Sequence, residues 1–141
     1  MRTSSLLASI TILAALALST ACSVSFSTAN MSSLKVGKEK PVTHEVTTFA
    51  PQDTIYATAT ISNSPGLVKV KGSFIVEDVP GQKPGPVPSL ETTVDLPSGG
   101  DANFTFTPGN PWPAGKYKFE AVMMNENGEA KDTKSVSFTI Q

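Results

Sequence analysis

Scarce residue types limit the chemistry that this chain of 141 residues can perform. Cys22 is the only cysteine, so no disulfide can form within the chain, and a single histidine, His44, cannot build a histidine-rich zinc site. Arg2 is the only arginine, and the 12 acidic residues outnumber the ten lysines. No basic surface is therefore expected to hold nucleic acid. We therefore expect no metal site, no cofactor and no nucleic-acid partner.

Residue patterns typical of an enzyme are also missing from the sequence. No serine lies in a G-x-S-x-G motif, and His44 stands beside Glu45 in a polar segment without a positioned nucleophile. Met123 and Met124 could bind copper through sulfur, but neighbours on a strand point to opposite faces of a sheet. The sequence predicts a protein that is not an enzyme, with His44 on the surface and one of the two methionines in the core.

The N-terminal segment has the three parts of an export signal. Arg2 supplies a positive charge, residues 6–18 form an uncharged and mostly apolar run, and small residues follow at positions 19–21. The run is shorter than the roughly 20 residues that a membrane-spanning helix needs. Residues 1–21 are therefore predicted to be a signal peptide, with an uncleaved N-terminal anchor as the alternative.

Cys22 follows this segment directly. Leu18-Ser19-Thr20-Ala21-Cys22 resembles the lipobox of bacterial lipoproteins, in which the thiol is acylated and the cysteine becomes the first mature residue. The match departs from the commonest form, because Ser19 occupies the position at which leucine is most frequent. Ser19 and Ala21 also fit an ordinary signal peptidase, and cleavage after Ala29 would leave a soluble chain without cysteine.

A lone cysteine in an exported protein needs an explanation, because the compartments outside the cytoplasm oxidise thiols. Acylation of Cys22 supplies one, and two or more acyl chains such as palmitate anchor a protein stably to a bilayer. The resemblance thus implies a lipid-anchored protein of the cell envelope. Ser23, rather than aspartate, resembles the signal for delivery to the outer membrane, on its periplasmic face, if the host has two membranes.

The 120 residues that follow residue 21 suffice for one domain of ordinary size. Residues 22–40 are predicted to be a lipidated cysteine and a serine-rich tether. Leu34 and Val36 alternate with polar residues there, so a first strand is an equal alternative. Residues 41–141 are predicted to be a folded domain.

Apolar and polar residues alternate repeatedly from Phe49 onward, which is typical of strands with one buried face. The runs cover residues 55–61, 68–76, 90–96, 104–106, 117–123 and 136–140. Gly72 interrupts the second run and predicts a bulge, and Asn127-Gly128 predicts a hairpin turn. The predicted core contains five phenylalanines: Phe74, Phe104, Phe106, Phe119 and Phe138.

Short strands at this spacing predict an all-β fold, a single antiparallel β-sandwich of about seven strands. Residues 112–120, followed by Asn127-Gly128 and a final strand, are similar to the closing hairpin of immunoglobulin-like domains in bacterial envelope proteins. The resemblance implies an immunoglobulin-like sandwich that lacks the paired cysteines. It implies no activity, because function depends on sites and not on folds.

Two segments are candidates for binding a partner. Four prolines in loop 80–88 favour an extended path that could be presented to a groove, although a rigid connector between strands is the alternative. Trp112, between two prolines, either anchors a partner or covers one end of the core. The candidate contact residues are Gln82, Lys83, Pro84, Pro86 and Trp112.

Two functions fit these features. The first is a membrane-anchored envelope lipoprotein that acts as a non-enzymatic binding or structural module and contacts another envelope protein or polymer. The second is a small inhibitor that inserts loop 80–88 into the cleft of a hydrolase such as a protease.

Overall fold

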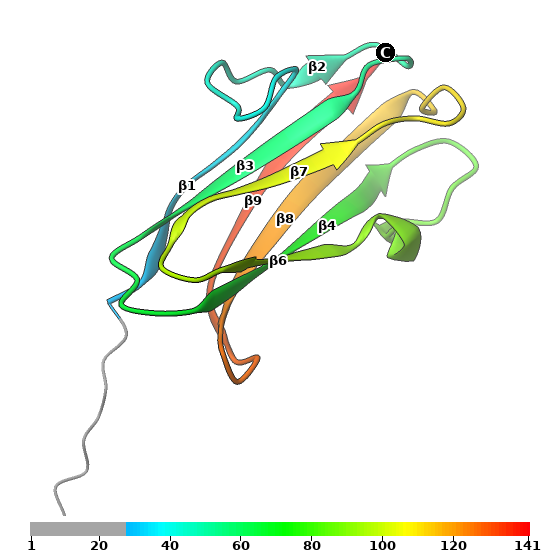
Figure 1. Ribbon diagram of the computed structural model, residues 1–141. Helices are drawn as coiled ribbons and strands as arrows, with labels where there is room; N and C mark the ends of the chain where they lie inside the picture. Colours follow the sequence, from blue (N-terminus) through cyan, green and yellow to red (C-terminus); the bar gives the residue numbers. More distant parts are fainter. Residues whose placement is uncertain (1–27) are drawn as a thin grey trace, which may run out of the picture.

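Two β-sheets stack face to face in the computed structural model, which describes residues 28–141 (Figure 1). The smaller sheet has the order β1-β3-β7, and the larger has the order β2-β9-β8-β4, with β5 and β6 both pairing with β4. All pairings are antiparallel except that of β2 with β9. The fold is therefore all-β and sandwich-like, in agreement with the prediction from the sequence.

Every alternating run lies within a strand, except at residues 90 and 91, which precede β6. The bounds of the strands are β1 (Asn30–Gly37), β2 (Thr48–Phe49), β3 (Ile55–Ser62), β4 (Val68–Asp78), β5 (Gly85–Pro86), β6 (Thr92–Leu96), β7 (Gly100–Phe106), β8 (Gly115–Asn125) and β9 (Ala130–Ile140). A short 3₁₀ helix, η1 (Pro88–Leu90), lies between β5 and β6. Within residues 28–141, no helix is long and apolar enough to cross a membrane.

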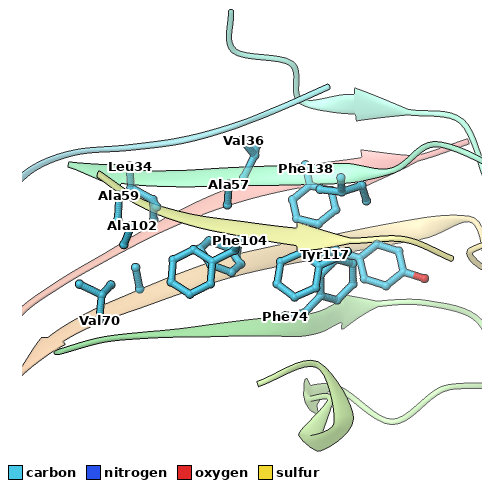
Figure 2. Close-up of a cluster of buried hydrophobic side chains, with 14 of the residues drawn as sticks. Leu34, Val36, Ala57, Ala59, Val70, Phe74, Ala102, Phe104, Tyr117 and Phe138 are labelled. Atoms are coloured by element: carbon cyan, nitrogen blue, oxygen red, sulfur yellow. The ribbon is translucent and has the colours of Figure 1, made fainter. Parts of the chain in front are cut away.

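Aromatic side chains fill the space between the sheets (Figure 2). All five predicted core phenylalanines are at most 4% exposed, which confirms the predicted core. Phe74 is central, because its ring centroid lies between 5.1 and 5.5 Å from those of four other aromatic residues. These neighbours are Phe106, Trp112, Tyr117 and Phe138. Stacked, tilted and edge-to-face aromatic pairs of this kind stabilise a core beyond the area that they bury.

Gly72 has a different role from the one that the sequence suggests. The pairing register of β4 runs without interruption through Gly72, which lies opposite Ala121 on β8 and Thr92 on β6. The predicted bulge at this position is wrong, and the irregularity in β4 lies between Val76 and Asp78. A Cβ atom at Gly72 would come within 2.6–2.8 Å of the rings of Phe104 and Phe119. Glycine is therefore required here because two aromatic rings from both sheets press against the backbone.

The segment that the sequence left open between tether and strand is a strand from Asn30 onward. β1 pairs with β3 along its length, and Leu34 and Val36 are buried in the core. The sheet thus begins before residue 41. The predicted signal peptide, Cys22 and the first residues of the predicted tether lie outside the described residues.

The two ends of the sandwich carry different loops. We call the end where the described chain begins the proximal end; it contains the turn from β3 to β4 and the β8–β9 hairpin (Figure 1). The opposite, distal end contains loop 80–88, the connection from β7 to β8, and the C-terminal residue Gln141 (Figure 1). The strands between these ends are up to 11 residues long.

The β8–β9 hairpin closes with a three-residue loop, as predicted at Asn127-Gly128. The amide of Gly128 donates to the carbonyl of Asn125, and the amide of Asn125 donates to the carbonyl of Glu129, both at 3.0 Å. Gly128 has a φ of 82°, whereas Asn127 does not have a positive φ. The turn therefore needs one glycine in the left-handed region, as three-residue hairpin loops commonly do.

Candidate functional site

Loop 80–88 divides into an exposed tip and a segment fixed to the sheet. Gln82, Lys83 and Pro84 are exposed at the distal end. The amide of Gln82 donates to the carbonyl of Val79 at 3.0 Å, which forms a turn at the beginning of the loop. After the tip, the chain returns to the edge of β4 as β5, so Pro86 lies opposite Ile75.

The fixed segment covers one side of β4 in the larger sheet. β5 pairs with the distal half of β4, β6 pairs with its proximal half, and the amide of Val87 donates to the carbonyl of Phe74 at 2.9 Å. Covered edges cannot pair with a strand from another chain. A partner that binds here therefore cannot pair with the backbone of β4, whereas the side chains of the tip at residues 82–84 are exposed to it.

Trp112 covers the distal end of the core. Its indole ring stacks on Phe74 with a centroid distance of 5.1 Å and an interplanar angle of 17°. The indole Nε1–H donates to the carbonyl of Asp53 at 2.9 Å, and the backbone N–H of Trp112 donates to the carbonyl of Pro51 at 2.8 Å. The side chain is half-buried and packs against the core. This packing explains most of why the indole is held in one position.

Both predicted binding segments are positioned by the same core residue. The ring of Phe74 supports Trp112, and the backbone carbonyl of Phe74 holds Val87 at the end of loop 80–88. Tyr117 adds a second tie at this end, since its hydroxyl donates to the carbonyl of Pro113 at 2.6 Å. The loops at the distal end are thus held on a rigid scaffold, as loops that bind partners commonly are.

A polar cluster that the sequence did not predict lies in the connection from β1 to β2. Glu39 Oε1 accepts hydrogen bonds from the side chain and the amide of Thr43 and from the amide of His44, and it lies 2.8 Å from His44 Nδ1. Hydrogen bonds from the Thr43 hydroxyl, then from the His44 ring and amide, lower the pKa of Glu39 to about 2. The only sequence signal was a glutamate four residues before a Thr-His pair.

This cluster ties a loop together and is not arranged for catalysis. In a catalytic triad, the histidine uses one ring nitrogen for the nucleophile and the other for the carboxylate. Here the same nitrogen, Nδ1 of His44, faces both the Thr43 hydroxyl at 3.1 Å and Glu39. The His44 side chain is 87% exposed, in agreement with the predicted surface position.

An ion pair fixes the neighbouring loop at the same end. Lys38 Nζ lies 2.9 Å from Asp53 Oδ2, which also accepts the backbone N–H of Ala50 at 2.8 Å. The hydrogen bond from Lys38, followed by that from Ala50, lowers the pKa of the Asp53 carboxyl. Because the carbonyl of Asp53 also receives the indole N–H of Trp112, this aspartate connects three segments of the distal end.

A groove at the proximal end was also not predicted from the sequence. The groove, of about 680 Å³, lies between the turn from β3 to β4 and the β8–β9 hairpin. It is lined by Ser64, Pro65, Gly66, Leu67, Val68, Met123, Met124, Asn125, Glu126, Asn127, Glu129 and Lys131. Met123 is buried and Met124 is half-buried, as expected for neighbours on a strand.

Across residues 28–141, no group of three or more histidine, cysteine, aspartate or glutamate side chains is placed to share a metal ion. Cys22 lies outside the described residues. No family model matches the chain, and no curated protein matches it.

Among solved structures, the chain is similar to part of a beta-glucosidase from Listeria innocua in complex with glucose. The sequences are 15% identical, the TM-score is 0.40, and the match covers 79% of this chain but 15% of the glucosidase chain. This chain thus corresponds to a small portion of the larger protein's length. A likeness this distant carries no information about activity.

Proposed function

We propose that the protein is a lipoprotein of the cell envelope, anchored through an acylated Cys22, that acts as a non-enzymatic binding or structural module. In a host with two membranes, it would lie on the periplasmic face of the outer membrane. The observation that carries the proposal is the separation between the two ends of the sandwich. The described chain and β1 begin at the proximal end, whereas loop 80–88 and the connection from β7 to β8, which contains Trp112, lie at the distal end (Figure 1).

This arrangement suits a module held at its N-terminus. A chain anchored at Cys22 would present its distal loops away from the bilayer, toward a partner protein or an envelope polymer. The tip residues are exposed and lie between two fixed points, so ordering them on binding costs little conformational entropy. The partner would contact Gln82, Lys83 and Pro84, and Trp112 lies at the same end of the sandwich.

The immunoglobulin-like assignment belongs to the same proposal. It is supported by two facing sheets, by the β8–β9 hairpin at the chain's end, and by the Tyr117 hydrogen bond to Pro113 near the start of β8. A tyrosine whose hydroxyl bonds to the backbone a few residues upstream is a recurring feature of that fold. Packing alone would then hold the two sheets together, without the disulfide that joins them in antibody domains.

The anchor is tested by mass spectrometry of the mature N-terminus in protein purified from a bacterial envelope. A diacylated or triacylated Cys22 is expected. An unmodified N-terminus at Cys22 or Asn30, or retention of residues 1–21, would overturn the proposed anchor. Cys22→Ser provides the control, because it has no thiol to acylate and its N-terminal peptide should carry no lipid.

The binding role is tested by capture of partners from envelope extracts. Deletion of residues 80–88 is unsuitable, because it would remove β5 and uncover the edge of β4. The combined variant Gln82→Gly, Lys83→Ser changes only exposed tip residues and should weaken capture. Lys134→Ser, on the exposed part of β9, removes the same charge elsewhere and should leave capture unchanged. Equal capture by all three proteins would overturn the role of the tip.

The geometry of the tip also fits the second candidate function, inhibition of a hydrolase. An exposed segment that is held at both ends, by the turn at Gln82 and by β5, can enter an enzyme cleft with little loss of entropy. Inhibition assays against purified proteases test this alternative. Inhibition that disappears in the Gln82→Gly, Lys83→Ser variant would favour an inhibitor over a structural module.

A further inference from the structure

The proximal groove is the surface that the proposed function leaves unused. Its floor includes Val68 and Met123, which are 5% and 1% exposed, and Leu67 on its wall is 37% exposed. Leu67 is the one large hydrophobic side chain that is exposed within residues 28–141. A single exposed leucine is ordinary on a protein surface. Here, however, it adjoins a groove with an apolar floor and charged walls.

The charges on the walls have a specific pattern. Glu129 Oε2 lies 3.1 Å from Lys131 Nζ and also accepts the side-chain amide of Asn125 at 3.2 Å. Glu126 makes no ion pair and no side-chain hydrogen bond with any of residues 28–141. The groove is thus lined by two carboxylates, of which that of Glu126 is unpaired, and by one ammonium group, that of Lys131, which is paired with Glu129. This pattern complements a zwitterion, which carries a cation and an anion a few atoms apart, better than it complements an anion alone.

The start of the described chain lies at the same end. Thr28 Oγ1 donates to the carbonyl of Asn63 at 3.0 Å, directly before the turn that forms one wall of the groove. Cys22 precedes Thr28 by six residues. Because an extended chain covers at most about 3.3–3.6 Å per residue, an acylated Cys22 would keep Thr28 within about 20 Å of the bilayer.

We infer that the proximal groove docks on the zwitterionic phospholipid headgroups of the bilayer that holds the chain. Glu126 faces the headgroup ammonium, Lys131 faces the phosphate, and Leu67 enters the interface. This inference rests on the proposed lipid anchor and adds an orientation to it. Tethering raises the effective concentration of headgroups at the groove, so a weak contact is enough to keep the proximal end on the membrane.

The chain's single tryptophan provides a direct test. Protein purified from the envelope is reconstituted into vesicles of phosphatidylethanolamine and phosphatidylcholine that contain brominated acyl chains, which quench nearby tryptophan fluorescence. Leu67→Trp adds one tryptophan at the groove, and Gln82→Trp adds one at the distal tip. The fluorescence of Trp112 is measured in the native protein and subtracted from the fluorescence of each variant. Both variants replace exposed residues, and thermal melts verify that both are folded.

Strong quenching of the added tryptophan at position 67 and weak quenching at position 82 are expected. Adding Glu126→Lys to Leu67→Trp should reduce the quenching, and so should replacing the zwitterionic lipids with phosphatidylglycerol. Equal quenching at both positions, or none at position 67, would overturn the docking. Quenching at position 67 that is insensitive both to Glu126→Lys and to lipid charge would overturn the headgroup contact.

The same preparation separates failure of the docking from failure of the anchor. An acylated N-terminus without selective quenching overturns the orientation and leaves the lipoprotein proposal standing. An N-terminus without acyl chains overturns the lipoprotein proposal, and the inferred docking falls with it.

Discussion

The hydroxyl of Tyr117 donates a 2.6 Å hydrogen bond to the carbonyl of Pro113, four residues earlier in the chain. This bond ties the beginning of β8 to the connection that carries Trp112. The Tyr117 side chain is also part of the core, where its ring lies 5.3 Å from that of Phe74. One residue therefore joins the distal loops to the packed interior.

Tyr117→Phe should lower the free energy of unfolding by about 0.5–1.5 kcal/mol, because one hydrogen bond is lost while the ring stays packed. Burial raises the pKa of Tyr117 in the folded state. A raised pKa gives stability that is present below the ordinary value of about 10 and is lost as the pH rises through the folded value. Denaturant titrations at neutral and alkaline pH should therefore show less alkaline destabilisation in Tyr117→Phe than in the native protein.

Gly72→Ala should destabilise the protein by about 1–3 kcal/mol, the usual cost of adding a methyl group to a filled core. The added Cβ would press on the rings of Phe104 and Phe119 at distances that real contacts do not allow. Gly109→Ala is the matched control, because nothing lies within 4 Å of its Cβ position, and it should change stability by less than about 0.5 kcal/mol. Equal denaturation midpoints for the two variants would contradict the assigned role of Gly72.

The loop that contains Glu39 should loosen in acid. The folded-state pKa of Glu39, about 2, lies below its ordinary value of about 4.3. The carboxylate therefore stabilises the loop above about pH 4.3, and this contribution is lost as the pH falls toward 2. A titration of the Glu39 carboxyl by NMR should show the low midpoint, and Thr43→Val should raise it. A midpoint near 4.3 in the native protein would refute the cluster.

Trp112→Phe separates packing from partner binding. Phenylalanine keeps an aromatic ring on Phe74 but loses the hydrogen bond from Nε1 to the carbonyl of Asp53, so a loss of about 1 kcal/mol is expected. Partner capture should change little if the indole only covers the core. A large loss of capture at nearly native stability would instead identify Trp112 as a binding anchor.

The combined change Gln82→Gly, Lys83→Ser should leave the melting temperature close to that of the native protein. Both side chains are exposed, and surface substitutions usually change stability by less than about 0.5 kcal/mol. Pro86→Gly should cost more, since Pro86 lies in β5 and glycine increases the entropy of the unfolded chain. A larger loss for the tip variant than for Pro86→Gly would show that the tip has contacts that maintain the fold.

The period of two in the sequence predicted most of the strands and all five core phenylalanines, because alternation reports directly which face of a strand is buried. The function of Gly72 could not be read in the same way. A glycine within a strand fits both a bulge and a close approach, and only the positions of Phe104 and Phe119, on other strands, decide between them.

The sites could be predicted from the sequence only in part. Glu39, Thr43 and His44 have no motif spacing, and their cluster forms because the chain between β1 and β2 folds back on itself. The proximal groove lies between the turn from β3 to β4 and the β8–β9 hairpin, which are separated by more than 50 residues, so no local pattern could reveal it. The exposed tip at residues 82–84 was predictable, because clustered prolines between two alternating runs favour a loop.

The described chain begins at one end of the sandwich and the distal loops lie at the other, which has a mechanical consequence. A force that acts between Thr28 and a partner held at the distal loops would run along the strand axes, and not across them (Figure 1). The hydrogen bonds between antiparallel strands are perpendicular to the strands, so those that join β1 to β3 would share the load together. Such a shear geometry resists pulling better than one in which the bonds break in succession, from one end of the pair to the other.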